Sequence, residues 1–159
     1  MPEQSLITDQ MRAYIGKDID WGPSFDVEKG AIKNFAEAIN DPNPLFTDEK
    51  YARSKGHSSV VAPPIFPTYN LPLGAPLKVL KFTFTVATGV HGGDEWELLQ
   101  DVHAGDTLTP KGKIINLVER EGKKGKMLFV TSEVTFTNQR GEIAAIYRPT
   151  EIFIAAPAK

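Results

Sequence analysis

The chain has 159 residues, 41% of them hydrophobic and 24% charged, which is enough to bury the core of one domain spanning residues 1–159. The near balance of 18 Lys and Arg with 20 Asp and Glu excludes a basic field for nucleic acid or an anionic membrane, and no apolar run approaches the roughly 20 residues that cross a bilayer, so we expect a cytoplasmic protein that binds neither. The absence of cysteine excludes disulfides and thiolate chemistry, and three scattered histidines predict no metal site, so any chemistry falls to carboxylates, histidine, hydroxyls or backbone amides.

The first predicted element is an amphipathic helix over residues 27–40, where apolar residues recur at helical spacing. It ends in the run Asn40-Asp41-Pro42-Asn43-Pro44, because the two prolines prevent helical continuation. A second, short helix capped by Thr47 is expected over residues 48–53, closed by Gly56. The proline-rich stretch that follows predicts an interrupted helix over residues 64–73.

Beyond residue 80 the sequence is rich in Val, Ile, Thr and Phe, with turn residues between the runs. Strands of an antiparallel sheet are predicted over residues 82–88, 95–102, 107–119, 127–138 and 142–154, with hairpin connections at 121–125 and 138–141. Helices followed by a long antiparallel meander predict an α+β fold, in which the sheet buries one face on a helix.

The segment from Phe35 to Ala52, FAEAINDPNPLFTDEKYA, resembles the signature of MaoC-like (R)-specific enoyl-thioester hydratases. There a helix enters an Asp-x-Asn-Pro-Leu-His loop, followed by an acidic turn and Tyr-Ala. Three later motifs support the resemblance: Ala62-Pro63-Pro64-Ile65-Phe66, His91-Gly92-Gly93 and Ala104-Gly105-Asp106-Thr107. The resemblance covers most of residues 10–154, extends to the N-terminal domain of FAS1-like dehydratases, and implies a hot-dog fold, a curled antiparallel sheet wrapped around a central helix.

The resemblance also implies a site. In the family, the loop Asp and the His five residues later hold a water between them, an arrangement suited to general acid–base chemistry. A backbone N–H at the start of the central helix stabilises the developing enolate oxygen. Asp41 matches the Asp, but Phe46 stands at the His position and cannot transfer a proton. Pro63 and Pro64 stand at the helix start, and proline has no N–H to donate.

These two departures resemble the non-catalytic partner in heteromeric hydratases of fatty-acid and sterol side-chain metabolism. We therefore expect the chain to bind a trans-2-enoyl or 3-hydroxyacyl thioester, presented by CoA or a carrier protein, as the dyad-deficient partner of a catalytic hot-dog chain. One alternative is a self-sufficient homodimeric hydratase that uses Asp41 with His91 or Glu95. Another is a non-enzymatic acyl-thioester binding or scaffold module.

Asp41 and His91 are the candidate catalytic residues, although an Asx turn also explains Asp41 and a surface hairpin also explains His91. Glycines after His91 would let the backbone approach a ligand closely. His57 and His103 are weaker candidates. The candidate substrate-binding residues are Asn43, Pro44, Phe46, Pro63, Pro64, Phe66, Gly92 and Gly93, of which Asn43 and Pro44 are better explained as shaping the loop. No cofactor is expected beyond the thioester carrier.

Overall fold

The computed structural model describes residues 5–72, 74–123 and 125–157. The described helices and 3₁₀ turns are α1 (Asp9–Arg12), α2 (Lys29–Ala38), α3 (Pro44–Thr47), α4 (Glu49–Ser54), η1 (Phe66–Asn70) and η2 (Ala75–Lys78), and the strands are β1 (Asp18–Ile19), β2 (Phe25–Asp26), β3 (Val86–Leu98), β4 (Thr107–Gly122), β5 (Gly125–Thr137) and β6 (Ile143–Ala155). None of the helices in these ranges is long and apolar enough to cross a membrane.

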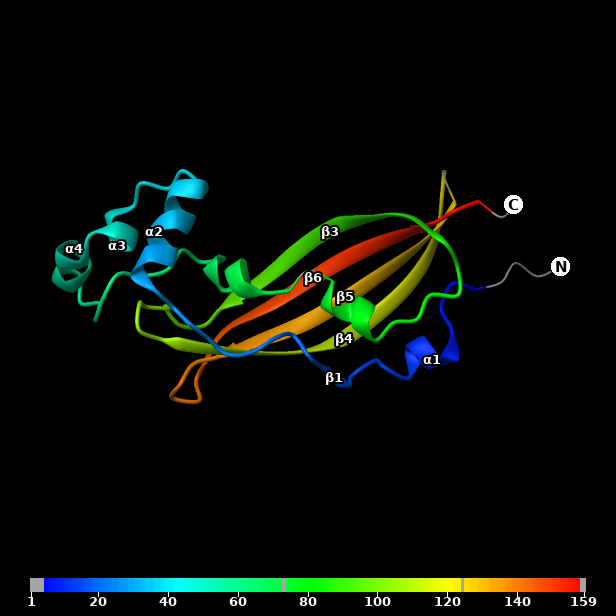
Figure 1. Cartoon of the computed structure of the whole chain (residues 1–159), viewed down its shortest axis with the longest axis horizontal. Helices are drawn as coiled ribbons and strands as arrows, with labels where there is room; N and C mark the ends of the chain where they lie inside the picture. Colours follow the sequence, from blue (N-terminus) through cyan, green and yellow to red (C-terminus); the bar gives the residue numbers. More distant parts are fainter. Residues whose placement is uncertain (1–4, 73, 124, 158–159) are drawn as a thin grey trace.

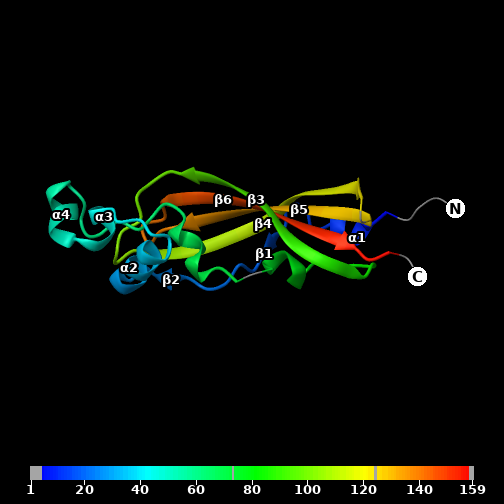
Figure 2. The same ribbon diagram turned by 90° about the horizontal axis from the view of Figure 1, so that it is seen from above.

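Four long antiparallel strands form the framework, in the order β4-β5-β6-β3, and the two-residue strands β1 and β2 both pair with β4. Figure 1 shows them running along the molecule, with α2, α3 and α4 gathered at one end and α1 towards the other. In Figure 2 the strands twist along their length, so the sheet is curled rather than flat. The α+β prediction is confirmed.

The central strands follow the predicted alternation of buried and exposed side chains. In β5 the residues Leu128, Val130, Ser132, Val134 and Phe136 are buried, whereas those between them are partly exposed. The predicted strands at 107–119, 127–138 and 142–154 match β4, β5 and β6 to within three residues at each end. The 138–141 hairpin closes through the Asn138 N–H, which donates to the Glu142 carbonyl at 2.9 Å, while the 121–125 connection contains residue 124, which lies outside the described residues.

The interrupted helix expected over 64–73 is replaced by the short 3₁₀ turn η1, although residue 73 itself lies outside the described residues; a second 3₁₀ turn, η2, follows it. Each has a proline in its first turn, and these closely spaced rings remove the N–H donors that a longer α-helix needs. Ala75 and Leu80 are nevertheless buried in the same cluster as the inner face of the sheet. In Figure 1 the green η2 turn lies across that face, where the resemblance implies a central helix.

The two strands predicted over 82–88 and 95–102 are one strand, β3. A register shift between His91 and Gly93, with Gly93 at φ 154°, absorbs one extra residue as a β-bulge. The alternative interpretation of His91 as a surface-hairpin residue is therefore wrong, since a bulge lets the strand continue through the glycines. Trp96 points inward and stacks on Tyr147, with ring centroids 4.5 Å apart.

The boundaries of the helices differ in detail from those predicted. Asp48, rather than Thr47, caps α4, because its Oδ1 accepts the Tyr51 N–H at 3.0 Å while Thr47 ends α3. Asn40 ends the preceding turn with φ 54°, a left-handed conformation that asparagine tolerates. Helix α1 and the two-residue strands β1 and β2 were not predicted, because segments this short carry no periodicity.

Trp21 anchors the N-terminal segment to β4. Its indole lies over Gly112, where a Cβ would stand only 2.2 Å from the indole Nε1. The glycine is therefore required by close packing, and any side chain at this position would displace the tryptophan.

Candidate functional site

The loop that carries Asp41 is held by its own hydrogen bonds. The Asp41 Oδ1 accepts the Asn43 N–H at 3.0 Å, and the Asn43 Oδ1 accepts the Leu45 N–H at 3.0 Å. Asn43 thereby caps α3, and Pro44 occupies its first turn. These contacts give Asp41, Asn43 and Pro44 a structural role in shaping the turn, as an Asx motif does.

Phe46 lies buried, with 6% of its surface exposed, in the hydrophobic cluster that joins α2 to the ends of the strands. It lines a cavity of about 180 Å³, which we call the apolar pocket, together with Leu45, Val61, Ala62, Pro63, Pro64, Pro67, Leu98, Gln100, Asp101, Val102 and Ala145. Three predicted substrate-binding residues, Phe46, Pro63 and Pro64, thus meet at one place. The cavity is smaller than the roughly 300–1,000 Å³ of complete small-molecule sites, so by itself it can hold only part of an acyl thioester.

The other predicted contacts lie elsewhere. Phe66 is fully buried against Phe35 in the core rather than in the apolar pocket. At Gly92 a Cβ would stand 2.9 Å from the Thr150 carbonyl oxygen, and Gly93 is the left-handed residue of the bulge. These two glycines are explained by the backbone of β3 without a ligand.

His91 lines a second cavity, of about 100 Å³, together with Trp21, Thr68, Leu71, Pro72, Gly74, Tyr147, Pro149 and Glu151. Its Nε2 lies 3.0 Å from the Asp94 Oδ1, and its neighbour across the strands is Glu151. Asp41 lines a separate hollow beside α2 and α3, so within one chain the structure does not bring Asp41 and His91 into a shared pocket. Glu95 does not join Asp41 either, because it binds Arg148 at 2.8 Å and is absent from the hollow that Asp41 lines.

Glu151 carries an unsatisfied buried oxygen in this second cavity. Its Oε2 has no hydrogen-bond partner among the described residues. Burial raises the pKa of Glu151 above its ordinary value of 4.5, and the charge of His91 opposes that shift. Burial, followed by a hydrogen bond with Asp94, also raises the pKa of Tyr147.

The raised pKa of Glu151 predicts a pH-dependent stability. The folded chain holds this proton more tightly than the unfolded chain. The contribution of Glu151 to the free energy of unfolding is therefore full below pH 4.5 and is lost as the pH rises from 4.5 through the pKa of the folded state. Glu151→Gln cannot ionise and is expected to be more stable than the wild type above this window, with a flatter dependence on pH. Urea unfolding of both proteins from pH 4 to pH 8 measures the difference.

Glu142→Gln is the matched control, because hydrogen bonds from Asn138 and Arg140 lower the pKa of Glu142. Its stabilising contribution is present above pH 4.5 and is lost on acidification through the lowered folded pKa, so this variant is expected to be less stable at neutral pH. A Glu151→Gln protein that is also less stable at pH 7 would contradict the buried-charge argument.

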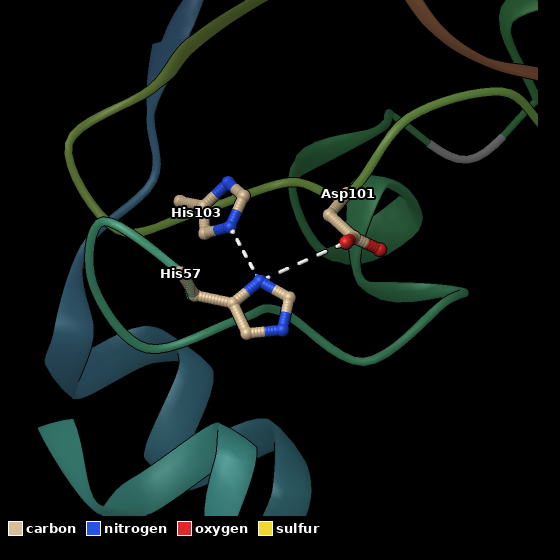
Figure 3. Close-up of side chains that lie close together, drawn as sticks. All are labelled: His57, Asp101 and His103. Atoms are coloured by element: carbon tan, nitrogen blue, oxygen red, sulfur yellow. Dashed lines mark hydrogen bonds and ion pairs between the residues drawn. The ribbon is translucent and has the colours of Figure 1, made fainter. Parts of the chain in front are cut away.

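Sequence reasoning did not group His57, Asp101 and His103, which the structure brings together (Figure 3). The His57 Nδ1 lies 3.1 Å from the His103 Nε2 and 3.8 Å from the Asp101 Oδ2. The two histidines are 46 residues apart, and an isolated β-bridge between Val61 and His103 joins their segments. No local sequence motif predicts that these two histidines lie close together.

Comparisons with known proteins show which family the chain resembles in sequence. The model of the family described as FAS1-like, dehydratase domain region, matches residues 13–147. A UPF0336 protein of Thermobifida fusca is 30% identical over 128 residues, which are 79% of this chain and 83% of the relative.

Two solved assemblies share the fold. The C-terminally truncated HadBC (3R-hydroxyacyl-ACP dehydratase) complex of Mycobacterium tuberculosis matches with a TM-score of 0.72 and 24% identity, over 87% of this chain and 96% of that chain. The ChsH1–ChsH2 complex of the same organism matches with a TM-score of 0.73 and 21% identity, over 94% of each chain. These similarities confirm the hot-dog fold. With the family model covering most of its length, the chain belongs to the FAS1-like dehydratase domain region family.

Proposed function

We propose that this chain is the non-catalytic subunit of a heteromeric MaoC-like dehydratase or hydratase. It lines the acyl pocket for a trans-2-enoyl or 3-hydroxyacyl thioester, and a partner chain supplies the Asp–His dyad. The observation that carries the proposal is Phe46, which occupies the position of the family's proton-transferring His, is buried, and lines the apolar pocket. A benzyl side chain there offers an acyl chain an apolar wall and offers water no base.

The polar groups around Phe46 support the same conclusion. Asp41, the other dyad position, already accepts the Asn43 N–H and lines a different hollow. The oxyanion position is occupied by Pro63 and Pro64, both of which lie in the apolar pocket and lack an N–H. Every catalytic element that the resemblance implies is thus missing from this side of the pocket or engaged in the fold.

The free edge of the sheet supports a partner chain. β3 is 13 residues long and lies at the end of the strand order, paired with β6 on one side only among the described residues. All but two of its residues are exposed, and a long edge of this kind is a template for pairing with another strand. Leu98, at the end of β3, lines the apolar pocket, so a partner along this edge would enlarge the pocket. Both solved structures described above are complexes by name, HadBC and ChsH1–ChsH2.

We infer no cofactor beyond the thioester carrier, which is CoA or a carrier protein. Adding water across the α,β double bond of an enoyl thioester, or removing it from the 3-hydroxyacyl thioester, requires only proton transfers and an oxyanion donor. A cytoplasmic location is part of the same proposal, since both carriers are found there.

The test is the loss of enoyl-thioester absorbance with a short and a long trans-2-enoyl-CoA. The chain is assayed alone and after co-expression with a MaoC-type chain from the same genome that retains both dyad residues. We expect no hydration by the isolated chain and hydration by the complex that exceeds the activity of the partner alone. Rapid hydration by the isolated chain would contradict the proposal and favour the self-sufficient homodimer.

The variant Asp41→Asn distinguishes a structural from a catalytic role of Asp41. Asparagine keeps the side-chain oxygen that accepts the Asn43 N–H but lacks the carboxylate. If the partner supplies the dyad, the variant complex keeps its rate within about twofold. If Asp41 is a general acid or base, the rate falls by roughly 10²–10⁴-fold. Substitution of the dyad Asp of the partner by Asn is the matched control and is expected to abolish turnover.

A further inference from the structure

We propose that His57, Asp101 and His103 form a binding site for a divalent transition-metal ion, with Zn²⁺ the expected ion. The proposal is independent of the proposed function. The His57 Nδ1, the His103 Nε2 and an Asp101 carboxylate oxygen lie within 4.8 Å of one another. Two imidazoles and a carboxylate are a donor set that suits Zn²⁺ and its first-row neighbours, and three protein ligands leave a fourth position open.

The distances are compatible with coordination after one small movement. Donors about 2.0–2.2 Å from a tetrahedral ion lie about 3.3–3.5 Å from one another. The two imidazole nitrogens are already 3.1 Å apart. The Asp101 oxygen is 3.8 Å from the His57 Nδ1, and its side chain is 63% exposed, so it is free to change rotamer and close the third side.

Backbone hydrogen bonds hold together the two chain segments that carry the histidines. His103 forms the isolated bridge with Val61, and on either side of it the Ala62 N–H donates to the Val102 carbonyl at 2.7 Å and the Ala104 N–H to the Val60 carbonyl at 3.0 Å. The segment after α4 and the segment between β3 and β4 are therefore joined directly beside the cluster. A site whose ligands are held in place loses less entropy on binding.

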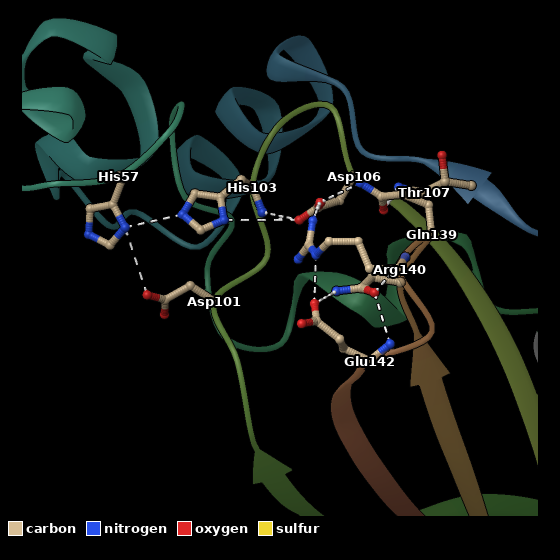
Figure 4. Close-up of polar contacts among 9 residues, drawn as sticks. His57, Asp101, His103, Asp106, Thr107, Gln139, Arg140 and Glu142 are labelled. Atoms are coloured by element: carbon tan, nitrogen blue, oxygen red, sulfur yellow. Dashed lines mark hydrogen bonds and ion pairs between the residues drawn. The ribbon is translucent and has the colours of Figure 1, made fainter.

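The charge of Asp106 favours the tautomer that coordination by His103 requires (Figure 4). Its buried carboxylate is held by the His103 N–H at 2.8 Å and by the Gln139 amide at 3.0 Å, with Arg140 also in contact. The Oδ2 lies 4.0 Å from the His103 Nδ1, on the far side of the ring from His57. At this distance the carboxylate accepts no hydrogen bond from the ring, but its negative charge favours a proton on Nδ1 and so leaves the Nε2 lone pair facing His57 and Asp101.

The same tautomer accounts for the contact between the two histidines. With a lone pair on the His103 Nε2, a proton on the His57 Nδ1 would lie between the two nitrogens, which are 3.1 Å apart, with Asp101 3.8 Å from the same Nδ1. An ion would replace this proton between the three groups. The expectation from the sequence that no metal is bound rested on the separation of the histidines along the chain, which the β-bridge overcomes.

The location gives the ion a chemical context. Asp101 also lines the apolar pocket, so the ion would stand at the edge of that pocket. The open coordination position is typical of sites that bind water or a ligand oxygen rather than of closed structural sites.

Isothermal titration of the EDTA-treated, dialysed full chain with Zn²⁺ tests the proposal, and Co²⁺ serves as a visible probe of coordination. We expect one ion per chain and, for His57→Gln and Asp101→Asn, a Kd raised by roughly a hundredfold or more, because even outer-shell changes cost about 10–100-fold. Asp106→Asn is expected to weaken binding by about tenfold while every direct ligand is retained. His91→Gln is the matched control, since His91 forms a His–Asp pair with Asp94 outside the cluster, and its Kd is expected to stay unchanged.

Two outcomes would overturn the proposal: no heat or Co²⁺ spectrum with the wild-type chain at millimolar metal, or binding that His57→Gln and Asp101→Asn leave intact. Each variant is first checked for cooperative unfolding. Where Asp106→Asn fails to fold, because it leaves buried partners unsatisfied, the two ligand variants, whose side chains are partly or largely exposed, decide the question.

Discussion

Phe66→Ala is expected to lower the free energy of unfolding by about 3–5 kcal/mol, the usual cost of truncating a buried phenylalanine. Phe66 is 0% exposed, and its ring packs edge-on against Phe35 with centroids 5.6 Å apart and stacks on Tyr69 at 5.6 Å. The cavity lies where η1 meets α2, and rigid proline-rich backbone around it limits collapse. Urea denaturation gives the change directly, and we expect Tm to fall by roughly 6–20 °C.

Tyr69→Ala is the matched control for this aromatic cluster. Tyr69 contacts both phenylalanines but is 49% exposed, so its loss is expected to cost about 1 kcal/mol. Phe66 was a candidate substrate contact in the sequence. A Phe66→Ala chain that keeps its stability but loses thioester affinity would restore that interpretation and contradict its place in the core.

The double variant Thr88→Lys/Val90→Lys is expected to weaken association with the partner chain by roughly 100-fold, or about 2.8 kcal/mol. Both residues are exposed on β3, Val90 at 46%, and they face Ile154 and Ile152 across the β3–β6 pair, so they share the outer face of the edge strand. Lysines on an edge strand oppose pairing with another chain, because their charges would be desolvated at the new interface. Analytical ultracentrifugation of the complex measures the change in Kd.

Ile39→Lys on the α2 side provides the control, because it adds a similar charge at a similarly exposed apolar residue away from β3. The monomeric double variant should unfold at close to the wild-type urea concentration, since neither side chain belongs to the core. Undiminished association of the double variant would place the partner on another surface and remove the edge-strand support for a heteromer.

The strands β4, β5 and β6 could be predicted because each has a more buried and a more solvated face, and their sequences alternate accordingly. The bulge in β3 defeated this reasoning, since His91-Gly92-Gly93 resembles a turn until the register with β6 is known. In the same way, prolines marked the 64–73 segment as irregular but could not indicate that the following 3₁₀ turn, η2, would pack on the sheet.

The site shows the same division between local and distant information. The motif around Asp41 and Phe46 is a local turn and its capping, so its structural role could be foreseen from the Asx pattern. The resemblance implied that Phe46, Pro63 and Pro64 lie close together, and all three line the apolar pocket. The grouping of His57 with His103 depends on a tertiary β-bridge, which no spacing along the chain encodes.

The fit of Trp21 over Gly112 gives the protein a natural optical reporter. The chain has only two tryptophans, and they sit in different surroundings: Trp21 in the N-terminal segment over β4, and Trp96 on the edge strand, stacked on Tyr147. Fluorescence of the Trp96→Phe protein would therefore follow release of the N-terminal segment, while that of Trp21→Phe would follow the edge strand. Comparing the two emission signals would distinguish local detachment of the N-terminal segment from loosening of the edge at which a partner would bind.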